Sequence, residues 1–178
     1  EADERFYYLT DVGDNAALIY YKSINNNENL WNDALTLLPT SSTTGWTNPH
    51  LVTFGASDYN GKVARYMSYN EARTTCNNTT NNLGTGGKCV YILEQSNFAY
   101  TNIRDGYWLG STNNSRVHTA SRSITTGSTR NGVRPVIQVP MDYVSLHVQA
   151  QVDHSPASGS CLWRTCIHDE HNQDRPCS

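Results

Sequence analysis

Two apolar runs enclose a polar, Thr- and Ser-rich ribbon in the segment Asp105–Pro140. The first run, Tyr107-Trp108-Leu109, follows an Asp-Gly turn dipeptide and predicts a short buried strand. The second, Val133–Val139, follows Asn131-Gly132, the dipeptide that best tolerates two positive φ angles and therefore indicates a hairpin. We expect two buried strands that act as a scaffold and display the ribbon between them.

Two residues of the second run have structural consequences. Pro135 has no backbone N–H, so its strand should lie at a sheet edge or carry a bulge. Arg134 stands between apolar neighbours, and a buried guanidinium must be paired. We therefore expect Arg134 to bind carbonyls or a carboxylate, and to belong with Tyr107 and Trp108 to the core.

The N-terminal third predicts a hairpin followed by a helix. Phe6–Leu9 and Ala16–Tyr21 are apolar runs on either side of a Gly13-Asp14-Asn15 turn. Apolar residues then recur at helical spacing from Leu30 to Leu38, and Pro39 closes the run.

The middle of the chain predicts further strands and a capped helix. Leu51–Phe54 and Val63–Tyr66 have strand character. Ser68 with Glu71 three residues later forms a capping box, so a helix should begin there and end near Cys76. The short apolar segment 90–93 is compatible with helix or strand. The fold class is therefore α+β, with one or two helices on irregular antiparallel sheets and long loops.

The order of these motifs resembles a domain of bacterial surface proteins, some of which carry pilin-like leaders. The quoted matches are GYW followed by S-T at 111–112, N-G-V-R-P-V-I at 131–137, and K-V-A-R-Y-M-S-Y-N-E-A at 62–72. The likeness covers roughly residues 50–143 and implies a C-type-lectin-like fold, related to sulfatase-modifying factors. Asn113 replaces a common proline, and the usual ribbon aromatic is absent around Val117-His118-Thr119, so the family's display surface does not transfer.

Length and charge limit the classes of protein and partner. The 178 residues suit one core, which we place in a lectin-like domain at 1–143, with a C-terminal strand and Cys-rich tail at 144–178. A net charge of −3 without a basic stripe argues against nucleic acid. No apolar run approaches the roughly 18 residues of a membrane span, so we do not expect a membrane-embedded protein.

Five cysteines and a surface rich in Asn, Thr and Ser are typical of exported proteins, so we expect an extracellular or cell-surface location. Cys76 and Cys89 bracket a polar loop whose closure would stabilise the fold by about 3 kcal/mol. We predict a disulfide here; the alternative is two buried thiols. Cys161, Cys166 and Cys177 leave one thiol free or bridging chains.

The candidate chemistry indicates binding rather than catalysis. We found none of the common catalytic or phosphate-binding motifs, and we predict no catalytic residue, cofactor or metal. Zinc at the Cys/His residues of 161–171 is the weaker alternative to disulfides. Trp46, in a polar loop, is either a sugar platform or, as we favour, a plug at the core edge. A ligand surface would contain Trp46, Arg116, His118 and Arg122.

After Met141 the chain alternates strictly between apolar and polar residues, as in a strand with one dry face. The apolar positions are Val144, Leu146, Val148, Ala150 and Val152. Such a strand either covers a sheet edge of its own domain or adds to the exposed edge of a neighbouring subunit.

Two functions are compatible with these observations. The first is a non-enzymatic structural or adhesive module of a bacterial surface, self-associating or joining neighbouring subunits in a filament or pilus. The alternative is a soluble lectin-like module that binds a carbohydrate or a host protein. An enzyme of the sulfatase-modifying type would need reactive cysteines near the last strands, and none lies between Gly106 and Pro140.

Overall fold

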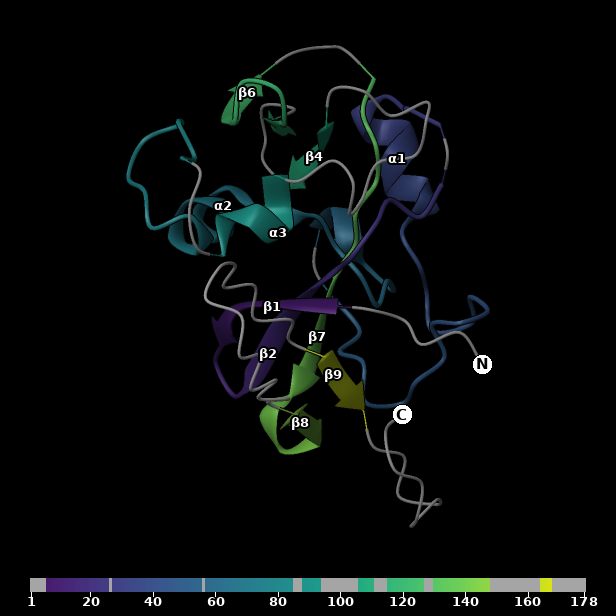
Figure 1. Ribbon diagram of the computed structural model, residues 1–178. Helices are drawn as coiled ribbons and strands as arrows, with labels where there is room; N and C mark the ends of the chain where they lie inside the picture. The colour runs from purple at the N-terminus through teal and green to yellow at the C-terminus, as the bar shows by residue number, and fades with distance from the viewer. Residues whose placement is uncertain are drawn as a thin grey trace.

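The computed structural model describes residues 6–25, 27–55, 57–84, 88–93, 106–110, 115–126, 130–147 and 164–167 (Figure 1). They form a mixed α+β structure of open sheets and short helices. One sheet has the order β1 (Phe6–Val12), β2 (Asn15–Tyr20), β7 (Val136–Pro140), and a second has the order β3 (Met67–Ser68), β4 (Gly106–Gly110), β5 (Ser115–His118), β6 (Ser123–Thr126). The helices are α1 (Trp31–Leu37), α2 (Tyr69–Thr75) and α3 (Cys89–Leu93), with 3-10 turns at Ser57–Tyr59 and Met141–Tyr143.

The first sheet is built on the hairpin that the sequence predicts. Gly13, with a φ of 60°, lies in the turn between β1 and β2, and β2 pairs antiparallel with both neighbours. Residues 16–20 of β2 are all buried because the strand lies in the middle of the sheet. β7 is the last strand in the order, as Pro135 led us to expect, and the Pro135 carbonyl accepts a hydrogen bond from the Tyr20 N–H at 2.8 Å.

The strands expected at Leu51–Phe54 and Val63–Tyr66 do not form, which corrects the sequence prediction. Both segments are attached to β7 at single positions instead. Arg65 and Val136 exchange backbone hydrogen bonds of 2.9 and 2.8 Å, and the Val52 N–H donates to Gln138 O at 2.9 Å. The Val63 N–H donates to Pro39 O, so no continuous ladder develops.

The second sheet is covered on both faces near β4. Tyr107 and Leu109 pack in a cluster with Ala72 of α2 and Ile92 of α3. Trp108, whose side chain points to the opposite face, packs in a cluster with residues of the α1 region, Ala34 and Leu38, and with Tyr66 and Val133. α1 therefore lies on one side of β4 and the α2–α3 pair on the other (Figure 1).

The prediction of a hairpin turn at Asn131-Gly132 is wrong. Neither residue has a positive φ. Asn131 bridges Asn29, and Gly132 pairs in parallel with Tyr107. The two apolar runs consequently lie in different sheets, as β4 and β7. The hairpin of this region connects β5 and β6 through residues 119–122, where Arg122 adopts the left-handed conformation with a φ of 51°.

Two tryptophans hold α1 against β4 by crossed hydrogen bonds. Trp108 Nε1 donates to Asn29 O at 2.8 Å, and Trp31 Nε1 donates to Leu109 O at 3.0 Å. Tyr66 Oη donates to the carbonyl of Trp31 at 3.1 Å. The ring N–H of each tryptophan and the hydroxyl of Tyr66 therefore each have a hydrogen-bond acceptor. Burying these three rings leaves none of these groups without a partner.

The local helix signals are confirmed. α2 begins at the predicted capping box, in which Ser68 Oγ accepts from the Glu71 N–H and Glu71 accepts from the Ser68 N–H. Residues 89–93 are helical, which decides the choice left open by their pattern.

The alternating C-terminal segment begins as β8 (Val144–His147), which pairs antiparallel with β9 (Arg164–Ile167) of the same chain. One edge of β8 is thus paired within its own chain. Val148, Ala150 and Val152 lie outside the described residues, as do Cys161 and Cys177.

We expect Trp108→Ala to lower the free energy of unfolding by about 3–5 kcal/mol, because it leaves a cavity between β4 and α1. Trp108→Phe is the matched control: it keeps most of the buried ring but loses the bond to Asn29, for about 1–2 kcal/mol. Denaturant unfolding of both variants measures the difference. An alanine variant as stable as the parent would contradict this packing.

Candidate functional site on the β5–β6 ribbon

The β5–β6 hairpin has one buried face and one accessible face. Ser115 and Val117 of β5 are buried, whereas Arg116 and His118 between them are partly exposed. Arg116 lies opposite Thr125, and His118 lies opposite Ser123, on the same face of the pair. We call Arg116, His118, Ser121, Ser123 and Thr125 the ribbon face.

A glycine sets the distance between this hairpin and the scaffold. Gly106 of β4 has a φ of 142°, and a Cβ at this position would lie 1.7 Å from Val117 O. Only glycine permits both the backbone conformation and the close approach of β4 to β5.

Arg116 is held in place by polar side chains. Its Nε donates to Thr125 Oγ1 at 3.2 Å, and its Nη1 donates to Asn131 Oδ1 at 3.1 Å. Asn131 is fully buried, so Arg116 connects the ribbon face to the interior. This guanidinium is therefore positioned before any ligand arrives.

His118 accepts hydrogen bonds from the hairpin loop. Its Nδ1 accepts from the Ser121 N–H at 3.1 Å and lies 2.7 Å from Ser121 Oγ, which is 2.6 Å from Ser123 Oγ. Because a backbone N–H can only donate, Nδ1 is the acceptor in the bond from Ser121. Imidazole and hydroxyls form one connected row of donors and acceptors.

The loop closed by the Cys76–Cys89 disulfide covers the outer edge of β6. The disulfide is present, as predicted. The Ile124 N–H donates to Asn81 O at 2.8 Å, and the Leu83 N–H donates to Arg122 O at 2.8 Å. Sequence reasoning treated this loop and the ribbon as separate, because no local signal shows that residues 81–83 dock beside β6.

Arg73 of α2 connects the helix to this loop. Its Nη2 donates to Tyr69 Oη and to Asn81 Oδ1, each at 2.8 Å, and its guanidinium lies 4.3 Å from the centre of the Tyr69 ring. Tyr69 Oη also hydrogen-bonds to Asn81 Oδ1. The loop is thus attached to α2 by side chains and to β6 by its backbone.

Arg134 has the structural role that the sequence predicts. Its Nε donates to Tyr20 O at 2.7 Å and its Nη2 to Tyr91 O at 2.6 Å, while its guanidinium lies 5.2 Å from the centre of the Tyr107 ring. Burial lowers the pKa of Arg134, and the neighbouring Tyr107 opposes this shift. Burial raises the pKa of Tyr107 to about 12. Tyr107 and Trp108 are also buried, in the interior where we expected them.

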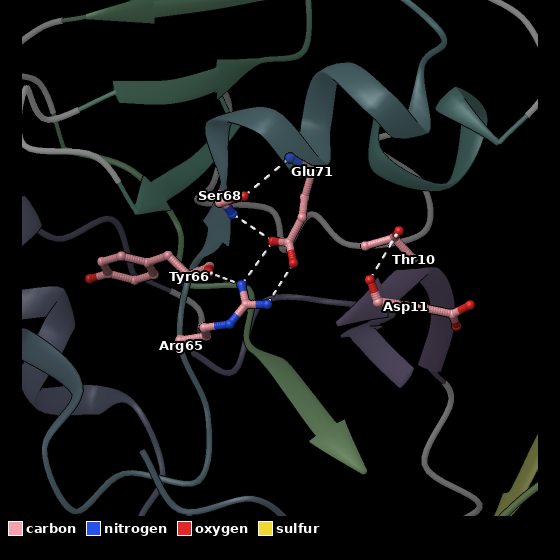
Figure 2. Close-up of polar contacts among 6 residues, drawn as sticks. All are labelled: Thr10, Asp11, Arg65, Tyr66, Ser68 and Glu71. Carbon is pink, nitrogen blue, oxygen red and sulfur yellow. Dashed lines mark hydrogen bonds and ion pairs between the residues drawn. The ribbon is translucent and has the colours of Figure 1, made fainter. Parts of the chain in front are cut away.

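A second arginine, Arg65, is partly buried and joins α2 to the first sheet. Arg65 makes a two-pronged ion pair with Glu71, at 2.8 and 2.5 Å, and donates to Tyr66 O at 3.0 Å (Figure 2). With its amide oxygen turned toward Arg65, Gln138 of β7 accepts at 3.0 and 3.3 Å. Burial alone would raise the pKa of Glu71, but the bonds and charge of Arg65, together with Ser68, hold this pKa below its usual value.

Trp46 does not belong to the ligand surface, which corrects that part of the prediction. Its side chain is 8% exposed and packs against Phe6 and Tyr20, with ring centres 6.0 and 5.4 Å apart. The indole extends the hydrophobic cluster of the first sheet, which confirms the plug that we favoured for this residue. Of the other proposed ligand residues, Arg116 and His118 lie on the ribbon face, and exposed Arg122 lies in its hairpin loop.

Among the described residues, no group of three or more His, Cys, Asp and Glu side chains is placed to hold a metal ion. The Cys/His segment 161–171 lies mostly outside the described residues. No helix in the described part of the chain is long and apolar enough to cross a membrane.

Comparisons of the chain with protein-family models, with curated proteins and with solved structures give no match. The resemblance to bacterial surface domains stays a prediction.

The ion pair makes a prediction about pH. Because the pKa of Glu71 is lowered on folding, its contribution to stability is complete above the unfolded carboxyl pKa of about 4.3 and is lost as pH falls through the folded value. Glu71→Gln should cost about 1–3 kcal/mol at pH 7 and less at pH 3. Asp142→Asn, at an exposed carboxylate, is the control. Urea unfolding across this range tests the prediction. A loss of stability in Glu71→Gln that is the same at every pH would contradict it.

The disulfide makes a second prediction. Replacing both Cys76 and Cys89 by serine should lower the free energy of unfolding by about 3 kcal/mol. Because the loop would no longer be closed, the amides of Leu83 and Ile124 should exchange faster with solvent. The amides of β2 should keep the same ranking of protection relative to one another. Hydrogen-exchange mass spectrometry measures both regions. Equal protection of Leu83 and Ile124 in the parent and the variant would show that docking does not need the disulfide.

Proposed function

We propose that this chain is a non-enzymatic structural or adhesive module of a bacterial surface that works outside the cell. The observation that supports this proposal most is the attachment of the polar ribbon on both sides. β4 pairs with β5 on one side, and the disulfide-closed loop bonds to β6 on the other. A polar hairpin fixed in this way loses little conformational entropy when it binds a partner.

The disulfide also supports the location that we propose. Disulfides form and persist in oxidising compartments, and the Cys76–Cys89 bond closes the loop that covers β6. A C-type-lectin-like arrangement of the domain at 1–143, with a separate tail from 144, is part of the same proposal.

For assembly we propose strand addition by the segment that starts with β8. β8 pairs with β9 and with no other strand of the described residues, so the two form a small sheet of their own. A two-stranded pair is marginally stable by itself, so exchange of β8 or β9 between chains would cost little. A filament or pilus would result if each chain passed its strand to the next one.

The second candidate, a lectin-like binding module, has an observation of its own. The ribbon face offers hydroxyls, an imidazole and a guanidinium in a fixed arrangement, which suits the hydrogen-bonding groups of a carbohydrate. Saturable glycan binding by a monomer would favour this candidate, whereas self-association at micromolar concentration would favour the first.

We expect a chain truncated after Tyr143 to remain folded and to lose its oligomers. The truncation removes β8 and β9, so neither strand can pair with a neighbouring chain. Sedimentation velocity and electron microscopy compare the truncated and full chains. Adding reductant to the full chain is the control, since it separates oligomers joined through the tail cysteines from those joined by strands. If the truncated chain assembles as before, or does not fold, assembly through this strand is wrong.

A further inference from the structure

The ribbon and the loop beside it are positively charged parts of an acidic protein. The chain has a net charge of −3, yet residues 106–141 contain no aspartate or glutamate and have three arginines besides the buried Arg134. Residues 72–93 of α2, the disulfide loop and α3 likewise contain an arginine and a lysine but no carboxylate. The hydrogen bonds between the loop and β6 bring these two segments together.

Two arginines lie beside the covering loop. Arg122 is exposed, and its backbone carbonyl accepts from Leu83. Arg73 reaches Asn81 from α2 and remains partly exposed. His118 is close to this end of the hairpin through its bonds to Ser121. We call Arg73 and Arg122, together with the neighbouring His118 and the exposed Asn81, Asn82 and Ser121, the cationic edge; its positive charge comes from the two arginines.

Two carboxylates near the ribbon and α2 do not neutralise Arg73 or Arg122. Glu71 of α2 is buried and already paired with Arg65. Glu28 precedes Asn29, which bridges Asn131, so it lies toward the Arg116 and Arg130 end of the ribbon. Arg73 and Arg122 can therefore attract an anionic partner.

We propose that the cationic edge binds an acidic polysaccharide through its carboxylate or sulfate groups. Guanidinium groups bind such oxyanions with paired hydrogen bonds, and the amides and hydroxyls of Asn81, Asn82 and Ser121 suit sugar hydroxyls. Single-stranded nucleic acid binds through exposed aromatic rings on which bases stack, whereas the Tyr69 ring at this edge is only partly exposed and already has the Arg73 guanidinium 4.3 Å from its centre. This inference rests on the proposed function only in taking the ribbon as an adhesive surface.

Binding of the full chain to four polymers tests the proposal: heparin as the sulfated probe, hyaluronan as the carboxylate-only probe, dextran as the neutral one, and oligo-dT. We expect heparin or hyaluronan to bind with an affinity that falls as salt rises, and the stronger of the two identifies the anionic group. Dextran and oligo-dT should bind at least tenfold more weakly.

Arg122→Asn is the decisive variant, because asparagine tolerates the left-handed conformation at this position while the charge is removed. It should lower the affinity for the polyanion about tenfold, and adding Arg73→Gln should lower it further. Lys88→Gln is the matched control: it removes an exposed positive charge that lies over Tyr8 of β1, and it should change affinity less than twofold. Thermal melts establish that each variant is folded.

Four results would overturn the proposal: no binding to either polyanion, equal binding of dextran, equal or tighter binding of oligo-dT, or equal losses from Arg122→Asn and Lys88→Gln. Self-association of a chain that binds no polyanion would remove this inference and leave the surface-module proposal standing. Polyanion binding by a chain that stays monomeric would support this inference and remove assembly through β8.

Discussion

The buried guanidinium of Arg134 is the interaction on which the rest of the structure depends. It lies where the first sheet, α3 and β4 meet, and it binds one carbonyl from β2 and one from α3 while facing the ring of Tyr107 in β4. A charge removed from water is very costly unless it is hydrogen-bonded, so these groups must keep their positions together. The tyrosine in turn donates to Ile92 O at 2.8 Å, which fixes α3 to β4.

Arg65 connects α2 to β7 by hydrogen bonds, as Arg134 connects β2 to α3. It uses the same Glu71 carboxylate that caps α2, so the start of the helix and its attachment to the sheet are one network. A polar network with unpaired groups inside a protein is less stable than an apolar core. The hydrogen bonds of the two arginines therefore favour one relative position of sheets and helices, and they also stabilise it.

The elements that the sequence predicted well are those decided by neighbouring residues. The capping box of α2, the β1–β2 turn at Gly13 and the burial of Tyr107-Trp108-Leu109 need only a few adjacent side chains to be identified. The disulfide was predictable because its two cysteines bracket a single polar loop.

The predictions that were wrong share a different cause. Asn131-Gly132 has the composition of a turn, but long-range partners, Asn29 and Tyr107, hold it in a bridge. The real hairpin, at 119–122, has no Gly or Asn, and Arg122 takes the left-handed position. Register and pairing depend on distant residues, which local patterns do not contain.

In the candidate site, too, some features follow from the local sequence and others depend on distant residues. Arg116 and His118 could be chosen from the sequence because they stand in a polar ribbon, but their roles could not. Arg116 is oriented by Asn131, and Arg73 and Arg122 both lie beside the disulfide loop because that loop bonds to α2 and to β6. Charged residues make up only 16% of the chain, yet the fold brings Arg73 and Arg122, which are distant in sequence, to the same loop. The absence of a basic stripe in the sequence therefore excludes a linear cationic motif, but it does not exclude a cationic surface assembled from α2, the disulfide loop and β6.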